Sequence, residues 1–290
     1  MTLEILEKIR EPFKIKEVEA IYPFRYEESM NSVLLQELAR FNKLIEVIKG
    51  SLQTLLKTLD GKFVTTAEIE ALKASILSNV IPERWKKASY QSRKPLLSYV
   101  TDLQQRLEML EHWIKNGKPN VFWISGFFFT QSFLTGIKQN FARRFNYPID
   151  QVEFRFEILK YTDAKKAENE PPQFGCFLQG LFLEGASWED MHGCLEESKR
   201  GEIFVSMPII NFVPKLVAPS ETQEQLPCDI NGSSHSFHYD CPTYKTGERY
   251  GTLLTTGHST NYVMNISLPS KIEPEHWVKR SVALLMQLDT

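Results

Sequence analysis

The hydrophobic period of this sequence changes once, and the change decides the fold class. Residues 152–158 read VEFRFEI, with an apolar side chain at every second position and a charged one between. This alternation places the apolar side chains on one face, as in a half-buried β-strand. Residues 262–268, YVMNISL, alternate in the same way and predict a second strand. Further strands are predicted in the apolar runs at 177–183, 203–213 and 282–288, which Gly, Pro and Ser separate.

The part of the sequence before residue 150 follows the period of an α-helix instead. Its longest stripe has apolar residues spaced by four and three positions: Leu34, Leu38, Phe41, Ile45, Ile48, Leu52, Leu55 and Leu59. Such spacing keeps the stripe on one helix face. A helix that continues through Gly50 would be about 40 Å long. An interior glycine costs about 1 kcal/mol relative to alanine and could also divide it.

A second helix is predicted from the stripe at Leu96, Val100, Leu103, Leu107, Leu110 and Ile114. It ends at the sequence NGKP, residues 116–119, which is typical of a helix terminus. Between the stripes, Thr65 and Glu68 have the spacing of a capping box that opens a helix through Ile76. The stripes could form an intermolecular coiled coil, but short connections favour an internal bundle.

Helices followed by strands predict an α+β fold. Residues 160–174 and 214–236 lack apolar periodicity and are predicted loops. A run around residues 122–133 is rich in aromatic side chains, but it is too short and too polar to cross a membrane.

Charge and cysteine content limit the classes of partner. The 290 residues carry a formal net charge of -2, which gives no reason to expect nucleic acid as a partner. One local basic cluster contains Arg84, Lys86, Lys87, Arg93 and Lys94. We interpret it as a solvated surface rather than an anion site. Four cysteines, at 176, 194, 228 and 241, and the absence of a visible secretory signal predict a reduced, intracellular protein.

Three chemistries have only weak support in the sequence. Neither Gly61-Lys62 nor Gly117-Lys118 has the context of a phosphate-binding loop. A zinc site would need the irregularly spaced set Cys228, His235, His238 and Cys241, which we interpret as loop residues without metal. His258 and Ser259 suggest a hydrolase, but neighbours on a strand point to opposite faces, so a turn is the better interpretation.

Two segments together resemble the C-terminal domain of axonemal dynein heavy chains. They are WISGFFFTQSFLTG at 123–136 and TTGHSTNYV at 255–263. Shorter motifs that match the same family occur along the sequence in the expected order: ESMN at 28–31, KPL at 94–96, QNFAR at 139–143, PID at 148–150, GLFLEGA at 180–186, CPTYKT at 241–246 and ALLMQL at 283–288. The amino-acid sequence at Trp123 and at residues 258–261 is similar to that of axonemal rather than cytoplasmic heavy chains, and indicates the inner-arm type. Four residues depart from the family pattern: Gln91, Arg93, Tyr250 and Ser281.

The resemblance implies an N-terminal helical subdomain followed by a C-terminal incomplete antiparallel β-barrel. Residues 1–26 would connect from the last AAA+ module, 27–149 would form the helical subdomain, and 150–290 the barrel-like subdomain. The motif residues expected to serve as structural or interface positions are Trp123, Gly126, Gln131, Thr135, Gly136, Gln139, Asn140, Gly257, His258, Ser259, Thr260 and Asn261.

The resemblance also implies a function. The protein would be a non-catalytic cap on the AAA+ ring of the same heavy chain, in the axoneme of a cilium or flagellum. ATP and Mg would bind upstream modules, and no metal or cofactor is expected here. Microtubules would be contacted only through the parent heavy chain, with no membrane and no nucleic acid. The alternative is a docking module for accessory axonemal subunits, and a hydrolase at His258 is a distant third.

Overall fold

A computed structural model describes residues 2–163, 167, 172–217, 237–249 and 260–290, and all structural statements concern these residues. The chain forms two compact units. The helical unit comprises Met1–Lys118, Gly126–Phe129 and Asp289–Thr290, and the sheet unit comprises Pro119–Ser125 and Thr130–Leu288. The predicted division into 27–149 and 150–290 stays a prediction, because compactness does not test which parts fold independently.

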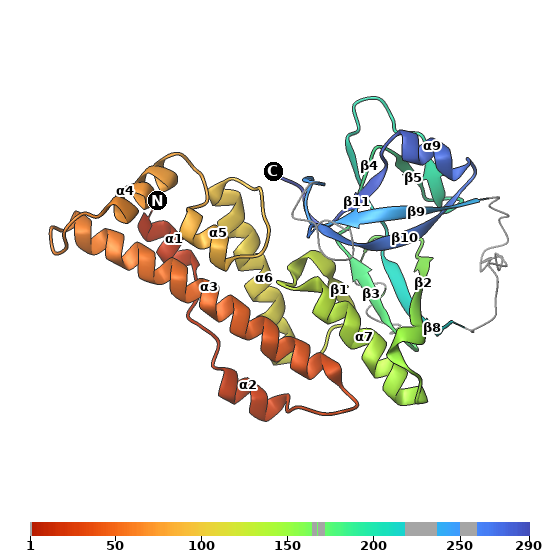
Figure 1. The fold of residues 1–290 in the computed structure, drawn as a ribbon, viewed down its shortest axis with the longest axis horizontal. Coiled ribbons are helices and arrows are strands. Elements are labelled where there is room, and N and C mark those ends of the chain that lie inside the picture. The colour runs from red at the N-terminus through yellow and green to blue at the C-terminus, as the bar shows by residue number, and fades with distance from the viewer. Residues whose placement is uncertain (1, 164–166, 168–171, 218–236, 250–259) are drawn as a thin grey trace. The chain divides into compact units, whose positions relative to one another are not determined.

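The helical unit is built around one long helix (Figure 1). Its helices are α1 (Thr2–Lys8), α2 (Ile15–Ile21), α3 (Ser29–Leu59), α4 (Ala67–Leu77), α5 (Glu83–Ala88) and α6 (Leu96–Asn116). The long helix α3 contacts all the other helices of the unit. The two helices predicted from the apolar stripes are therefore confirmed as α3 and α6.

The stripe on α3 shows why the helix is continuous. Its residues from Leu34 to Leu55 are buried, and only Leu59 at the end is exposed. Gly50 lies on the exposed side, where a side chain would meet open space. The glycine therefore removes no packing contact. Burying each leucine or isoleucine of the stripe contributes about 1.5–3 kcal/mol, which outweighs the roughly 1 kcal/mol cost of one interior glycine.

Both stripes face the interior of the unit. On α6, Leu96, Leu103 and Leu110 are fully buried. A coiled coil between separate molecules would need these side chains on the surface, so the internal bundle is confirmed. The helix ends where predicted, because Gly117 adopts a φ of 92°. At α4 the predicted cap is wrong by one residue, since the Thr66 hydroxyl, not that of Thr65, accepts the bond from the Ile69 amide at 3.4 Å.

The sheet unit contains helix α7 (Thr130–Phe145), helix α9 (Pro274–Lys279) and two mixed sheets. Its short 3-10 turns are η1 (Ile124–Gly126, whose last residue belongs to the helical unit) and η2 (Ile149–Gln151). Its strands are β1 (Val121–Trp123), β2 (Val152–Ile158), β3 (Cys176–Gln179), β4 (Phe182–Glu184), β5 (Ser187–Glu189), β6 (Cys194–Glu196), β7 (Phe204–Ser206), β8 (Ile210–Leu216), β9 (Phe237–Tyr244), β10 (Tyr262–Ser270) and β11 (Ala283–Leu285). The four-stranded sheet has the order β1-β3-β8-β2, and the seven-stranded sheet has the order β5-β6-β10-β9-β11-β4-β7.

The α+β class and the two alternating strands, β2 and β10, are confirmed. The prediction of a purely antiparallel sheet is wrong, because β1 pairs parallel with β3, β6 with β10, and β9 with β11. Among the described strands neither sheet closes on itself, so the incomplete barrel is not confirmed. Parallel pairs need long connections between their strands. The hydrophobic alternation within a strand does not reveal whether its partner is parallel or antiparallel.

Candidate functional site

The segment at 123–136 passes through both units along its length. Trp123 ends strand β1 in the sheet unit, Gly126–Phe129 belong to the helical unit, and Thr130 begins α7 in the sheet unit. The four residues Gly126–Phe129, which we call the crossover turn, are thus separated from the rest of the helical unit in sequence. Their contacts within that unit show what holds them there.

A buried carboxylate binds the backbone of the crossover turn. Glu37 lies on α3 within the apolar stripe and is fully buried. Its side chain accepts hydrogen bonds from the amides of Phe128 and Phe129, the second at 3.1 Å. Arg40, one turn further along α3, approaches the same carboxylate at 3.2 Å. Burial raises the pKa of Glu37, and the two amides and the nearby arginines oppose this shift. The carboxylate acts here as the acceptor for two partly buried backbone amides.

A second charged pair holds the carbonyl side of the turn. Arg106 on α6 donates to the carbonyl oxygen of Phe127 at 3.4 Å. Its Nε donates to Asp102 at 2.6 Å, and both side chains are almost fully buried. The Tyr90 hydroxyl also donates to Asp102, at 2.8 Å, and the guanidinium lies 3.8 Å from the centre of the Tyr90 ring. Burial raises the pKa of Tyr90 well above its ordinary value, so this phenol remains a donor at neutral pH.

Aromatic rings fill the space around the same turn. The Phe128 ring packs edge-on against Phe41 at 5.4 Å and against Tyr90 at 6.0 Å. Phe127 meets Trp113 edge-on at 6.5 Å. Such pairs add about 0.5–1.5 kcal/mol each beyond the area that they bury. The crossover turn is therefore fixed through its amides, one carbonyl and two rings, and this arrangement positions backbone rather than a substrate.

Sequence reasoning missed Glu37, Asp102 and Arg106. A signal existed, since Glu37 interrupts an apolar stripe on the face that the stripe buries, between Leu34 and Leu38. Asp102 and Arg106 directly precede two residues of the second stripe and are four residues apart, a spacing at which opposite charges meet on one helix face. A charged side chain on a buried face requires a partner, and that partner lies far away in sequence.

Other residues of the first motif segment and of helix α7 lie in the sheet unit. Trp123 packs so closely on Gly180 that an added Cβ would lie 2.4 Å from the indole Cδ1, and Gly180 has a φ of 86°. The Ser125 hydroxyl donates to the carbonyl oxygens of Met286 and, at 3.2 Å, of Gly180. On α7, Gly136 is buried, Gln139 and Asn140 are half-buried, and Thr135 is exposed.

The second motif segment is described only in part. Gly257, His258 and Ser259 lie outside the described residues, so the hydrolase interpretation is not tested. The Asn261 amide donates to the Thr246 hydroxyl at 2.9 Å, and the Asn261 backbone carbonyl accepts from the Lys245 amide at 2.9 Å. The Lys245 ammonium donates to the Thr260 carbonyl at 3.1 Å, and burial lowers the pKa of this lysine.

One hydrogen bond connects the two motif segments. Gln131, at the start of α7, donates to the carbonyl oxygen of Tyr262 at 3.5 Å, next to Asn261 in the sequence. In the described part of the second segment, the carbonyl oxygens of Thr260, Asn261 and Tyr262 therefore all accept hydrogen bonds from elsewhere in the sheet unit.

The four residues of the zinc hypothesis divide between described and undescribed parts. Cys228 and His235 lie outside the described residues. On β9, His238 is exposed and Cys241 is fully buried. They point to opposite faces of the strand and cannot bind one ion together. Burial raises the pKa of the Cys241 thiol, which disfavours the thiolate that binds zinc. No group of three His, Cys, Asp or Glu residues in the described ranges could hold a metal.

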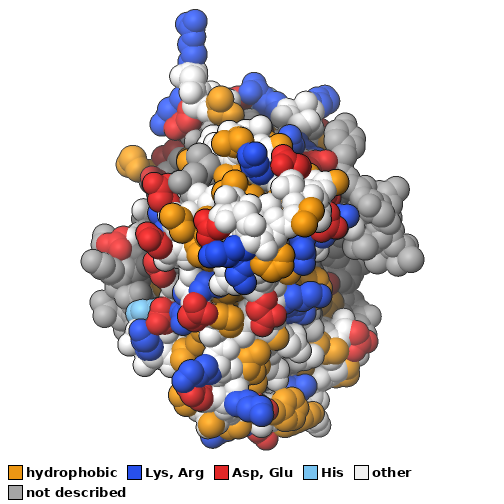
Figure 2. Space-filling view, turned by 90° about the vertical axis from the view of Figure 1, so that its left-hand side faces the viewer, with side chains coloured by type: hydrophobic (Ala, Val, Ile, Leu, Met, Phe, Trp, Pro, Cys, Tyr) orange, Lys and Arg blue, Asp and Glu red, His pale blue; other side chains and the backbone are white. Residues whose placement is uncertain are grey.

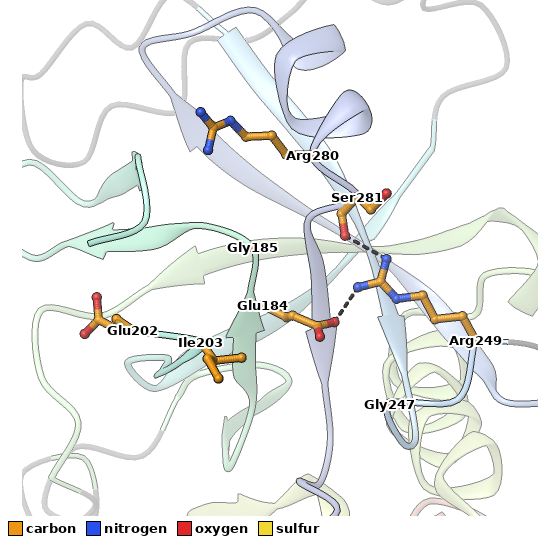
Figure 3. A pocket seen from close by; sticks show the side chains of 8 residues that line it. All are labelled: Glu184, Gly185, Glu202, Ile203, Gly247, Arg249, Arg280 and Ser281. Atoms are coloured by element: carbon orange, nitrogen blue, oxygen red, sulfur yellow. Dashed lines mark hydrogen bonds and ion pairs between the residues drawn. The ribbon is translucent and has the colours of Figure 1, made fainter. Parts of the chain in front are cut away.

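A shallow pocket of about 470 Å³ opens in the sheet unit (Figure 3). Two arginines and two glutamates line it, but the arginines already have partners. Arg249 pairs with Glu184 and donates to the Ser281 carbonyl at 2.7 Å, and Arg280 pairs at 2.7 Å with Glu197 outside the lining. The Arg280 side chain points away from the Glu184–Arg249 pair in Figure 3. A substrate anion would have to displace these carboxylates, so the pocket gives no ready-made binding site.

Comparison with known proteins gives the family. The family model for the C-terminal domain of dynein heavy chains matches residues 1–286. The protein belongs to this family. It is 47% identical over 286 residues to dynein axonemal heavy chain 1 of Rattus norvegicus, covering 99% of this sequence and 6% of that relative.

Two further relatives agree with this assignment. The sequence is 46% identical over 291 residues to dynein axonemal heavy chain 12 of Mus musculus, covering 100% of its own length and 9% of the relative. It is 44% identical over 286 residues to dynein axonemal heavy chain 3 of Homo sapiens, covering 99% and 7%. This dynein C-terminal domain thus spans less than a tenth of the curated relatives that it matches. None of its described helices is long and apolar enough to span a membrane.

Proposed function

We propose that this domain is a non-catalytic, regulatory cap on the AAA+ ring of an axonemal dynein heavy chain. The observation that carries the proposal is the family match over residues 1–286, together with 44–47% identity to three axonemal heavy chains. The parent heavy chain would move on microtubules in a cilium or flagellum, with ATP and Mg bound in its AAA+ modules.

The internal construction of the domain supports a mechanical role. Glu37 and Arg106 bind backbone groups of the crossover turn rather than converging on an open cavity. A catalytic acid or base must instead lie within hydrogen-bond reach of a substrate. Buried ion pairs and ring contacts fix backbone geometry, and a firm body that contacts several ring modules would favour some ring conformations over others.

Deleting residues 27–290 from the heavy chain is the first test. The truncated motor should still hydrolyse ATP, because the phosphate-binding loops are expected upstream, while gliding velocity or force should change. A folded truncated motor that has lost ATP turnover completely would contradict the non-catalytic part of the proposal. Deletion also exposes whatever ring surface the domain covers and could cause aggregation, so point substitutions are the cleaner second test.

Three strongly exposed apolar side chains suit that second test. They are Phe24 before α3, Val64 after α3 and Met191 after β5. Serine at each position removes surface contacts and should leave the melting temperature of the domain unchanged. We expect at least one substitution to change gliding velocity while the motor retains ATP turnover. If velocity, force and turnover all stay constant while an accessory axonemal subunit no longer attaches, the docking-module alternative replaces the cap.

A further inference from the structure

The basic residues that were interpreted from the sequence as a solvated surface lie beside exposed apolar side chains. Residues 73–97 contain six basic residues and one acidic residue, Glu83, in a protein whose net charge is -2. In the same stretch, Leu77, Val80 and Leu97 are 74%, 46% and 45% exposed. Basic residues and exposed apolar residues therefore occur together in one stretch of the helical unit.

The local structure explains why these apolar side chains are neighbours. Helix α4 ends at Leu77, and Asn79 follows in the left-handed conformation with a φ of 55°. The Asn79 carbonyl accepts from the Leu96 amide at 2.9 Å, and its side chain accepts from the Leu97 amide at 3.0 Å. Asn79 thereby ties the end of α4 to the beginning of α6. Leu77, Val80 and Leu97 all lie within two residues of this junction.

The basic side chains of residues 73–97 divide into two groups. Lys94 pairs with Asp102 at 3.6 Å, and Arg93 pairs with Asp289 at 3.7 Å. The remaining four cations are all exposed: Lys73, Arg84, Lys86 and Lys87. Within the part of the sequence that the structure describes, no carboxylate forms an ion pair with any of these four side chains. Figure 2 shows that apolar, basic and acidic side chains are interspersed on the side of the molecule that it views.

We infer that this surface binds an acidic amphipathic helix of a partner protein. We define the basic–apolar surface as Lys73, Leu77, Val80, Arg84, Lys86, Lys87 and Leu97. Its complement is a stripe of apolar side chains flanked by carboxylates, which one helix presents at positions i, i+3, i+4 and i+7. The four cations would attract the carboxylates and set the orientation, while the three apolar side chains supply the buried area.

A membrane surface fits the same residues less well. Helices that lie on membranes carry a wide apolar face with large aromatic or leucine side chains. The aromatic residue of α5, Trp85, is instead fully buried and donates to the Ser51 hydroxyl at 2.8 Å. The exposed apolar side chains are three aliphatic ones around a single junction. The inference rests on the charges and exposed side chains of this surface and does not depend on the regulatory role.

The test uses a synthetic helical peptide of about 18 residues, long enough to hold a helix in water. One version flanks a leucine stripe with glutamates, and a matched version flanks it with lysines. We expect the 290-residue protein to bind the glutamate peptide, as measured by fluorescence anisotropy. Binding should weaken by about tenfold or more near 1 M salt, where the Debye length is about 3 Å. Equal binding of the lysine peptide, or no binding of the glutamate peptide, overturns the inference.

Matched variants locate the binding surface. Leu77→Ser/Lys87→Glu should reduce affinity about tenfold or more, since both the apolar and the electrostatic contacts are lost. Ile21→Ser/Lys16→Glu on α2 is the control, because it makes closely similar chemical changes at exposed positions near the other end of α3 (Figure 1). Equal affinity of the two double variants overturns the inference.

A charge-only variant, Arg84→Gln/Lys86→Gln, leaves every apolar residue of the surface in place. It should weaken binding and flatten the salt dependence even if the Leu77 variant unfolds. Unchanged binding and unchanged salt dependence would overturn the inference. Vesicles of phosphatidylserine and phosphatidylcholine form the last arm, and binding to vesicles without binding to the peptide would replace the protein partner with a membrane surface.

Discussion

The helical unit fixes its crossover turn with charged groups, whereas the sheet unit fixes the Thr260–Asn261 turn mainly with neutral ones. In the first, Glu37 and Arg106 bind backbone amides and a carbonyl, and Asp102 pairs with Arg106. In the second, an asparagine amide, a threonine hydroxyl and backbone groups satisfy one another, with Lys245 at the edge.

This difference has an energetic consequence. A buried charge that loses its partner is much more costly than a buried amide or hydroxyl that loses one, because the charged group is more strongly hydrated in the unfolded state. The helical unit should therefore be more sensitive to single substitutions at its turn than the sheet unit. It should also depend more on pH. Measurements of stability in matched variants test both expectations.

The largest effect is expected for Glu37→Ala. The change removes the acceptor of the partly buried Phe128 and Phe129 amides and leaves Arg40 without this carboxylate. We expect the free energy of unfolding to fall by about 3 kcal/mol or more. Urea denaturation followed by far-ultraviolet circular dichroism measures it. Glu46→Ala, at an exposed position of the same helix, is the control and should stay within about 0.5 kcal/mol of the wild type. Equal losses in the two variants would show that the carboxylate contributes nothing specific.

Asn261→Ala should have an intermediate effect. It removes the donor to the Thr246 hydroxyl and carbonyl, in a position that is almost fully buried. The expected loss is about 1–3 kcal/mol, because no charge is left without a partner. Asn265→Ala is the matched control, at an exposed position of strand β10, which begins directly after Asn261. A loss at Asn261 as large as that at Glu37 would mean that charged and neutral turns are equally sensitive to losing a partner.

The sequence predicts the helical unit better than the sheet unit, and the reason lies in where each signal comes from. A period of 3.6 residues identifies a helix from its own residues, so α3 and α6 are predicted with their buried faces. The parallel pairing of β1 with β3, and of β9 with β11, joins segments that are far apart in the sequence. The residues of a strand do not identify the strand with which it pairs. Splitting of the predicted runs 177–183 and 203–213 into two strands each depends on such pairing.

The candidate site shows the same limit. The motif residues of 123–136 are identified by resemblance, but the groups that hold the crossover turn are not. Glu37 and Arg106 lie 91 and 21 residues from the turn atoms that they bind. Their positions on apolar stripes indicate burial, and nothing local indicates which backbone they contact. Long-range hydrogen bonds of this kind become visible only once the packing of the helices is known.

The smallest effect, a change in pH dependence, tests the charged turn most directly. Burial raises the pKa of Glu37 above the ordinary value of 4.5 that it has in the unfolded state. In the window that starts at this ordinary value and ends at the raised one, the folded domain binds more protons than the unfolded state. Stability therefore decreases as pH rises through the window, since the slope of unfolding free energy follows the difference in bound protons. Below the ordinary value this contribution is fully present.

Glu37→Gln removes the titration while keeping the shape of the side chain, so the difference between wild type and variant isolates one carboxyl from all others. Plotted from about pH 3 to about pH 7, the stability of the wild type relative to the variant should decline and then level off. Lys245→Met, which removes the half-buried cation at the edge of the neutral turn, should leave this acidic window unchanged, because the pKa of Lys245 is lowered from an ordinary value of 10.5, far from that of a carboxyl group. If the wild type instead gained stability relative to Glu37→Gln as pH rose, the two amides and Arg40 would outweigh burial. The charged turn would then be held most firmly by the ionised form of its central carboxylate.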